Sequence, residues 1–217
     1  MHFFEQAYQG LPLWEIGRPQ PAFVRLEEAG EIQGRVLDVG CGTGELSLYF
    51  AARGHPTVGI DFAPTAVSRA TAKAQDRSLS VTFRVASALE LGALGERFDT
   101  VTDCGLFHTF LDPHRAEYSR SLGSVLAPGG RAFVLCFSEQ EPVDWGGPRR
   151  VTQPELRSTF GRDFEVRWIR EERFETRDPA VTGRAWLAAL RRRAEPAVRA
   201  RRSPPKSPPE LRRRAAR

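Results

Sequence analysis

Three glycines alternate with other residues in the segment LDVGCGTGEL, at Gly40, Gly42 and Gly44, directly after a short apolar run. Glycine permits a positive φ and a close approach of main chain to ligand, so this turn is typical of nucleotide binding. Glu45 stands where a dinucleotide turn of the form G-x-G-x-x-G has its third glycine, and no Gly-Lys-Ser/Thr of a P-loop follows. A carboxylate there would repel a pyrophosphate at a helix N-terminus. The pattern favours a nucleotide not held by its phosphates; a plain strand-to-helix turn is the structural alternative.

S-adenosylmethionine fits this pattern, because its sulfonium and ammonium outweigh its single carboxylate. A crevice lined by Asp38, Glu45 and Asp61 would attract such a cation. Asp61 ends the next apolar run, where a carboxylate can accept hydrogen bonds from ribose hydroxyls in either a dinucleotide or an adenosylmethionine site. Glu45 therefore decides between the two, and an NAD-dependent oxidoreductase is the alternative if that reasoning fails.

His108, in the segment CGLFHTF, is the candidate catalytic residue. A neutral imidazole can take or orient an acceptor proton near pH 7, and a packed turn residue is the equal alternative. Methyl transfer mainly needs the nucleophile aligned and desolvated, so an acidic acceptor needs no base. His2, His55 and His114 make no metal-binding spacing with His108, and we expect no metal.

Aromatic side chains near the expected acceptor side could stack against a flat heterocycle. The candidates are Phe107, Phe110 and Trp145. Each has a packing role as its alternative.

Strands and helices alternate along the chain in a way that would place these residues at one edge of a sheet. Short β-branched runs predict strands at 35–40, 57–61, 81–85, 98–103 and 131–137. Segments with helical apolar spacing lie between them: GELSLYFAARG, APTAVSRATAKAQ and DPHRAEYSRSLGSVLAPGG. This alternation predicts an α/β fold with a mostly parallel sheet, helices on both faces and the ligand crevice at the carboxyl ends of the strands.

The remaining segments complete the expected domain. TQPELRSTF predicts a helix, FEVRWIR a strand, and RAWLAALRR a final strand, although its arginine-rich end also suits a helix. Before the first strand, a helix, a proline-punctuated loop and a second helix form a cap that could close over the crevice. We therefore expect a cap at 1–34, a catalytic domain at 35–193 and a disordered basic tail at 194–217.

The charge is concentrated at the C-terminal end. The whole chain carries +5, but residues 184–217 carry +10, so residues 1–183 carry −5. Nucleic acid is therefore an expected partner only through the tail. Three cysteines without paired spacing, and the absence of a long apolar run or an export signal, predict a cytoplasmic protein without a membrane span.

The segments VLDVGCGTGE, VGIDFAPTAV and FDTVTDCGLFH resemble motif I, the acidic end of strand two and strand four of class I S-adenosylmethionine-dependent methyltransferases. LWEIGRPQPAFVRL, DCGLFHTF and VLCFS are similar to the small-molecule thiol, halide and thiopurine methyltransferases. The nearest likeness is to bacterial heterocyclic toxin methyltransferases, which O-methylate hydroxylated quinolones. The resemblance spans about residues 1–190.

The resemblance implies a Rossmann-like seven-stranded sheet with its last strand antiparallel. It implies that Asp61 holds the ribose, that Phe62 flanks the adenine, and that a loop with Trp14 and Arg18 covers the cofactor, Arg18 pairing with its methionine carboxylate. Ser87 replaces an aspartate that many relatives use to accept from the adenine amino group, which should weaken affinity by about 1 kcal/mol. The implied cofactor-binding residues are Trp14, Arg18, Asp38, Gly40, Cys41, Gly42, Gly44, Asp61, Phe62, Ser87, Ala88, Asp103 and Cys104.

The favoured function is transfer of a methyl group from S-adenosylmethionine to O, N or S of a small, aromatic heterocyclic molecule, with release of S-adenosylhomocysteine. A nucleic-acid methyltransferase is the first alternative, although DCGLFH stands where amino-methylating enzymes have Asp/Asn-Pro-Pro-Tyr/Phe. A non-catalytic S-adenosylmethionine-binding protein is the second. We expect a monomer or weak homodimer with a small-molecule acceptor as its partner.

Overall fold

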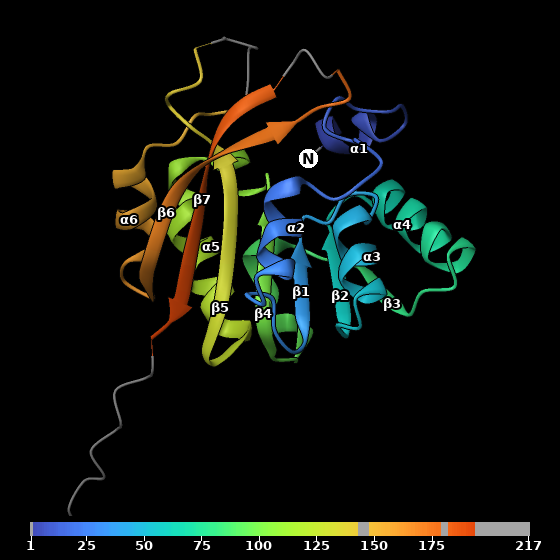
Figure 1. The fold of residues 1–217 in the computed structure, drawn as a ribbon, viewed down its shortest axis with the longest axis horizontal. Helices are drawn as coiled ribbons and strands as arrows, with labels where there is room; N and C mark the ends of the chain where they lie inside the picture. The colour runs from blue at the N-terminus through green and yellow to red at the C-terminus, as the bar shows by residue number, and fades with distance from the viewer. Residues whose placement is uncertain (1, 143–147, 179–181, 194–217) are drawn as a thin grey trace, which may run out of the picture.

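A seven-stranded sheet in the order β3-β2-β1-β4-β5-β7-β6 forms the core of the protein (Figure 1). The structure is a computed structural model, and it describes residues 2–142, 148–178 and 182–193. Trp145 and the basic segment 194–217 lie outside the described residues. The strands are β1 (Val36–Val39), β2 (Thr57–Asp61), β3 (Val81–Val85), β4 (Phe98–Cys104), β5 (Leu126–Phe137), β6 (Phe164–Glu175) and β7 (Thr182–Arg192).

The predicted fold class is confirmed. Strands β1 to β5 pair in parallel, whereas β7 is antiparallel to both β5 and β6. The segment RAWLAALRR, whose assignment the sequence left open, is a strand because it lies between two others. Its run of apolar residues is buried on both faces, as expected for a central strand.

Helices cover both faces of the sheet. Helices α2 (Pro21–Glu28) and α3 (Glu45–Ala52) lie in front of it in Figure 1, and α4 (Pro64–Asp76) packs on β2 and β3. The other face is covered by η1 (Ala88–Leu94), α5 (Asp112–Val125) and α6 (Gln153–Phe160), whose apolar residues join the larger core cluster. The sequence predicted that the APGG segment ends a helix. Helix α5 ends at Val125, however, and this segment belongs to β5.

The N-terminal segment is divided between the core and the crevice. Helix α2 was expected in a cap, but Ala22, Phe23 and Leu26 pack in one core cluster with Phe133 of β5 and Leu187 of β7. The prediction was wrong for α2 because its apolar stripe matches the sheet face. Only α1 (His2–Ala7) and the residues up to 20 remain on the strand-end side, where Figure 1 shows α1 above α4.

The strand register brings the motif residues to one edge. Val39 of β1 is paired with Ile60 of β2 and with Asp103 of β4. Asp61, Gly40 and Cys104 therefore lie side by side at the carboxyl ends of the neighbouring strands β2, β1 and β4. Open α/β sheets bind ligands at this edge.

Candidate functional site

The glycine loop after β1 has a backbone that only glycine adopts readily. Gly40, Gly42 and Gly44 have φ values of +71°, +54° and +87°. A Cβ on Gly44 would also lie 2.7 Å from Cζ of Phe83 and 2.9 Å from Cβ of Ala70. Both the left-handed conformation and the packing therefore require glycine at this start of α3.

Asp61 holds this loop against the end of β2. Its Oδ2 accepts a hydrogen bond from the Gly42 N–H at 3.0 Å, and its Oδ1 accepts from the Ala63 N–H at 2.9 Å. Burial raises the pKa of Asp61, and these two backbone donors oppose that shift. Each carboxylate oxygen keeps a further acceptor site, so Asp61 can still bind hydroxyls of a ligand.

Two other carboxyls organise the loops from below. Asp38 is 1 % exposed and accepts from Ser47 Oγ at 2.6 Å and Thr102 Oγ1 at 3.1 Å; burial raises the pKa of Asp38 to about 6. Asp103 accepts from Tyr118 Oη at 2.7 Å and from backbone N–H groups of the turn after β4, and burial raises the pKa of Asp103 to about 7. Asp38 is therefore not the open acidic lining that the sequence analysis expected, because its carboxyl is almost completely buried.

Glu45 does not face the crevice as an uncompensated charge. Its carboxylate accepts from Lys73 Nζ at 2.8 Å and from Arg77 Nη1 and Nη2 at 2.8 and 2.9 Å. These cations, one in α4 and one directly after it, hold the pKa of Glu45 below its usual value, against the opposing effect of burial. The inference that Glu45 selects a cationic cofactor was therefore wrong, because two neighbouring cations neutralise it.

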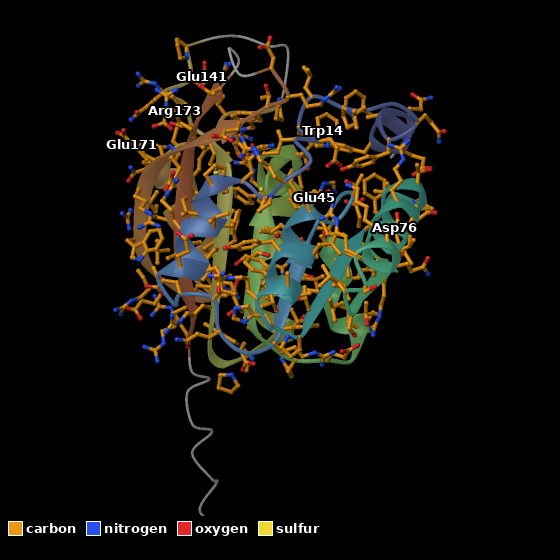
Figure 2. All side chains as sticks on the ribbon, turned by 45° about the vertical axis from the view of Figure 1, so that its right-hand side comes forward. Trp14, Glu45, Asp76, Glu141, Glu171 and Arg173 are labelled. Carbon is orange, nitrogen blue, oxygen red and sulfur yellow. The ribbon has the colours of Figure 1, made fainter. Side chains whose placement is uncertain are left out.

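The N-terminal segment lies directly on the glycine loop. The Tyr8 hydroxyl would stand 2.7 Å from a Cβ on Gly42, and Trp14 Nε1 donates to that hydroxyl at 3.2 Å. Glu15 hydrogen-bonds Thr43 of the loop. Trp14 is 43 % exposed and lies at the strand-end side of the molecule, above Glu45 (Figure 2). Tyr8 and Glu15 were missed in the sequence, because a tyrosine just after a short helix and a glutamate beside a tryptophan carry no motif.

The other expected cofactor residues lie around the same edge. Arg18 pairs with Glu175 of β6, so its predicted partner, a methionine carboxylate, would compete with a protein carboxylate. Phe62 contacts Phe4 of α1 edge-on at 6.0 Å. Ser87 caps η1, its Oγ accepting from the Leu89 N–H at 3.2 Å, and Ala88 is the first residue of that helix.

Cys41 and Cys104 lie at the ends of the adjacent strands β1 and β4. Burial raises the pKa of both thiols well above the usual value, and nearby carboxylates add to the shift. Both residues therefore remain neutral thiols at physiological pH and line the edge as small apolar groups.

His108 is buried at the turn after β4, only 5 % exposed. Its Nδ1 accepts the Phe137 N–H at 3.0 Å, and its ring stacks on Phe137 with centroids 4.8 Å apart. Burial, reinforced by Arg115, lowers the pKa of His108 to about 3. The lowered pKa makes the imidazole neutral, and because Nδ1 accepts a hydrogen bond, the ring proton is on Nε2.

The expected aromatic acceptor residues are only partly placed as predicted. Phe107 is fully buried, 5.0 Å from the ring of Phe160, so its assignment to the acceptor was wrong: the side chain points into the core under α5. Phe110 is half-buried against Tyr118 at 4.9 Å. Trp145 is among the residues that the structure does not describe.

Two aromatic residues that the sequence did not single out flank His108. Phe174 of β6 lies 5.7 Å from the His108 ring and 4.9 Å from Phe137 of β5. The turn is closed by Gly105, at φ +87°, where a Cβ would lie 3.4 Å from Phe174 and 3.6 Å from His108. No local signal marks Phe137 or Phe174, because they meet His108 only through the order of the strands.

Within the described ranges, no group of three or more His, Cys, Asp or Glu side chains could hold a metal ion. No described helix is long and apolar enough to cross a membrane.

The chain is similar to known methyltransferases. Residues 36–130 match a methyltransferase domain family. Over 173 residues the chain is 40 % identical to a 2-heptyl-1-hydroxyquinolin-4(1H)-one methyltransferase of Mycobacteroides abscessus, covering 75 % of this chain and 76 % of that protein. It is 32 % identical to a probable thiol methyltransferase 2 of Arabidopsis thaliana, covering 64 % of this chain and 62 % of that one.

A solved structure described under "Conversion of a Disulfide Bond into a Thioacetal Group during Echinomycin Biosynthesis" superposes with a TM-score of 0.82 at 36 % identity, covering 88 % of this chain and 92 % of that chain. The matching domain spans the glycine loop, Asp61 and the turn after β4, which are the residues that the site geometry brings together. The chain belongs to the class I S-adenosylmethionine-dependent methyltransferases.

Proposed function

We propose that this methyltransferase acts on a small aromatic heterocycle whose acceptor atom is acidic. The observation that carries the proposal is the aromatic group of His108, Phe137 and Phe174 at the carboxyl end of β4. The 40 % identical relative, named for a hydroxyquinolinone, supports the same class of acceptor.

The donor fits the glycine-loop side of the crevice. The glycine loop follows β1 at its carboxyl end, and Asp61 beside it has acceptor sites left for ribose hydroxyls. S-adenosylmethionine, when bound, supplies an electrophilic methyl group. Trp14, held by Tyr8 and still partly exposed, would cover the cofactor from the N-terminal side.

The acceptor would lie against Phe137 and Phe174, with the His108 Nε2–H directed to its heteroatom. Rings at these distances favour offset or edge contacts with a further aromatic ring. They also exclude water, which raises the reactivity of an anionic nucleophile.

The state of His108 defines the kind of acceptor. A side chain whose pKa is lowered to about 3 is a poor general base at neutral pH. The acceptor must then ionise by itself, as N-hydroxy heterocycles and aromatic thiols do, and O, N and S remain open as the methylated atom.

The test measures release of S-adenosylhomocysteine with a panel of acceptors. 2-Heptyl-1-hydroxyquinolin-4(1H)-one and thiophenol are expected to be turned over, and 4-phenyl-1-butanol, an unacidic aromatic alcohol, is not. Turnover of an oligonucleotide or of aliphatic thiols, with none of the aromatic acceptors, would overturn the proposed class. Binding of S-adenosylhomocysteine without any turnover would favour a non-catalytic protein.

A further inference from the structure

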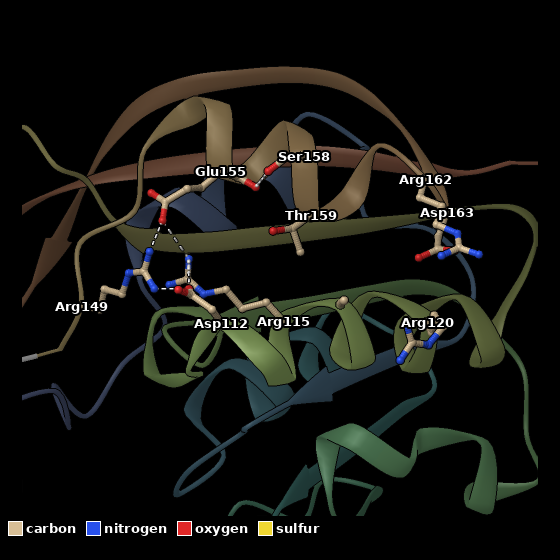
Figure 3. A pocket seen from close by; sticks show the side chains of 10 residues that line it. Asp112, Arg115, Arg120, Arg149, Glu155, Ser158, Thr159, Arg162 and Asp163 are labelled. Atoms are coloured by element: carbon tan, nitrogen blue, oxygen red, sulfur yellow. Dashed lines mark hydrogen bonds and ion pairs between the residues drawn. The ribbon is translucent and has the colours of Figure 1, made fainter.

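A pocket of about 430 Å³ lies between α5 and α6, on the face of the sheet opposite α2 and α3 (Figure 3). One side of α5 and one side of α6 with the turn after it supply its walls. None of the residues of the glycine loop lines it. The pocket is lined by residues 112, 115, 116, 120, 149, 155, 158, 159, 162 and 163.

One end of the pocket is closed by balanced charges. Arg149 pairs with both Asp112 and Glu155, and Arg115 Nη1 lies 3.2 Å from Glu155 Oε1 and 3.9 Å from Asp112 Oδ1. Glu155 also accepts from the backbone and side chain of Thr152 in the capping box of α6. The carboxylate oxygens at this end thus accept hydrogen bonds from the protein itself.

The other end has donors without acceptors. Arg120 and Arg162 are exposed and make no hydrogen bond or ion pair with any described residue. Figure 3 shows both at the end of the pocket away from Glu155 and Arg149. The neighbouring carboxylate of Asp163 accepts the Ser119 hydroxyl at 2.7 Å. At the first end, Arg115 is 4 % exposed, and its Nη2 is buried without a hydrogen-bond partner among the described residues. Native structures rarely leave such a donor unpaired, and together these groups leave the pocket short of acceptors.

We propose that this pocket binds a small phosphate-bearing molecule, with the phosphate held by Arg120 and Arg162. Guanidinium groups present planar forks of N–H donors that match phosphate oxygens. The volume is within the range of small-molecule sites, which is about 300–1,000 Å³, so it can hold an organic part as well as the phosphate.

The pocket is lined by Arg115, which contacts the turn after β4. Arg115 Nε donates to the Phe110 carbonyl at 3.3 Å, and its guanidinium lies 4.8 Å from the ring centre of Phe107. An occupant would therefore contact a side chain that fixes the segment around His108, at a site separate from the cofactor.

The test is thermal unfolding of the full chain with saturating S-adenosylhomocysteine, so that the cofactor site is filled. Inorganic phosphate, glucose 6-phosphate and glucose are titrated against sodium chloride of equal ionic strength. Both phosphate compounds are expected to raise Tm in a saturable way, and glucose is not. The ester should act at lower concentration, which distinguishes a bound small molecule from a bound ion.

The double variant Arg120→Gln/Arg162→Gln should bind glucose 6-phosphate about tenfold more weakly or worse, since a charged hydrogen bond is worth about that factor. Arg157→Gln/Arg167→Gln removes the same charge from α6 and β6 outside the pocket and should bind as the wild type does. Both variants should keep the S-adenosylhomocysteine shift. An equal phosphate response in the two double variants, or no response beyond that of sodium chloride, overturns the proposal.

Discussion

The two halves of the crevice are built in different ways. In the proposed function, the ligand-facing parts on the side of β1 and β2 are main chain: the glycine loop, fixed by Asp61 through backbone N–H groups. On the side of β5 and β6, they are side chains that meet from distant segments, His108 with Phe137 and Phe174. In this proposal the first half binds the donor through main chain, which side-chain substitutions alter little, whereas the second half contacts the acceptor through side chains, which single substitutions can alter.

The largest loss of stability is expected when a side chain is added to the glycine loop. Gly44→Ala forces a side chain into a left-handed residue and against Phe83 and Ala70, so the free energy of unfolding should fall by about 3 kcal/mol or more. Gly54→Ala is the matched control, because Gly54 has φ +91° but nothing within 4 Å of its would-be Cβ; it should cost about 1 kcal/mol. Urea unfolding measures both, and equal losses would show that packing at Gly44 is unimportant.

The next effect concerns the carboxylate that fixes the loop. Asp61→Asn leaves one side-chain oxygen for two backbone donors, so stability should fall by about 1.5–3 kcal/mol. The rise in Tm on adding S-adenosylhomocysteine should vanish. Asp76→Asn, at the exposed end of α4, is the control and should keep the full shift. A full shift in Asp61→Asn would refute its role in cofactor binding.

Substitutions at two phenylalanines test the side of the crevice proposed to bind the methyl acceptor. Phe174→Leu should raise the KM of an aromatic acceptor about tenfold, the size of one lost aromatic pair, and leave the S-adenosylhomocysteine shift unchanged. Phe107→Leu should instead lower the free energy of unfolding by about 1–2 kcal/mol with KM unchanged, because its ring is in the core. The reverse result would restore Phe107 as an acceptor residue.

This contrast also explains what could be predicted from the sequence. The glycine loop, Asp61 and the alternation of strands and helices are local patterns, so the fold and the family followed from them. Strand β7 was uncertain because its apolar run fits a strand or a helix until β5 and β6 flank it.

The errors arose where a side chain's direction depends on packing. Glu45 seemed to face a ligand, but α4 brings Lys73 and Arg77 to it from about 30 residues away. Phe107 and His108 are neighbours in sequence, yet the short 3-10 helix η2 (Phe107–Thr109) turns one into the core and the other toward Phe137. Tertiary contacts of this kind leave no periodic signal in a single sequence.

The smallest expected effect is on how the free energy of unfolding depends on pH. The folded-state pKa of His108 is about 3, below its unfolded value, so the unfolded chain binds the proton first as the pH falls. The stabilisation from neutral His108 is complete above about pH 6.5 and is lost toward lower pH. Asp38 and Asp103 act oppositely: their raised pKa values mean that their contribution is present at low pH and is lost as the pH rises through about 6 and 7.

His108→Asn isolates the first contribution, because an asparagine oxygen can still accept the Phe137 N–H but does not titrate. Between pH 8 and pH 6, the free energy of unfolding of the wild type should fall relative to that of the variant by about 1 kcal/mol. Urea unfolding at several pH values gives this difference directly, since the carboxyls are common to both proteins. A difference that stays constant with pH would mean that His108 is accessible to protons in the folded protein, and a general-base role would then have to be reconsidered.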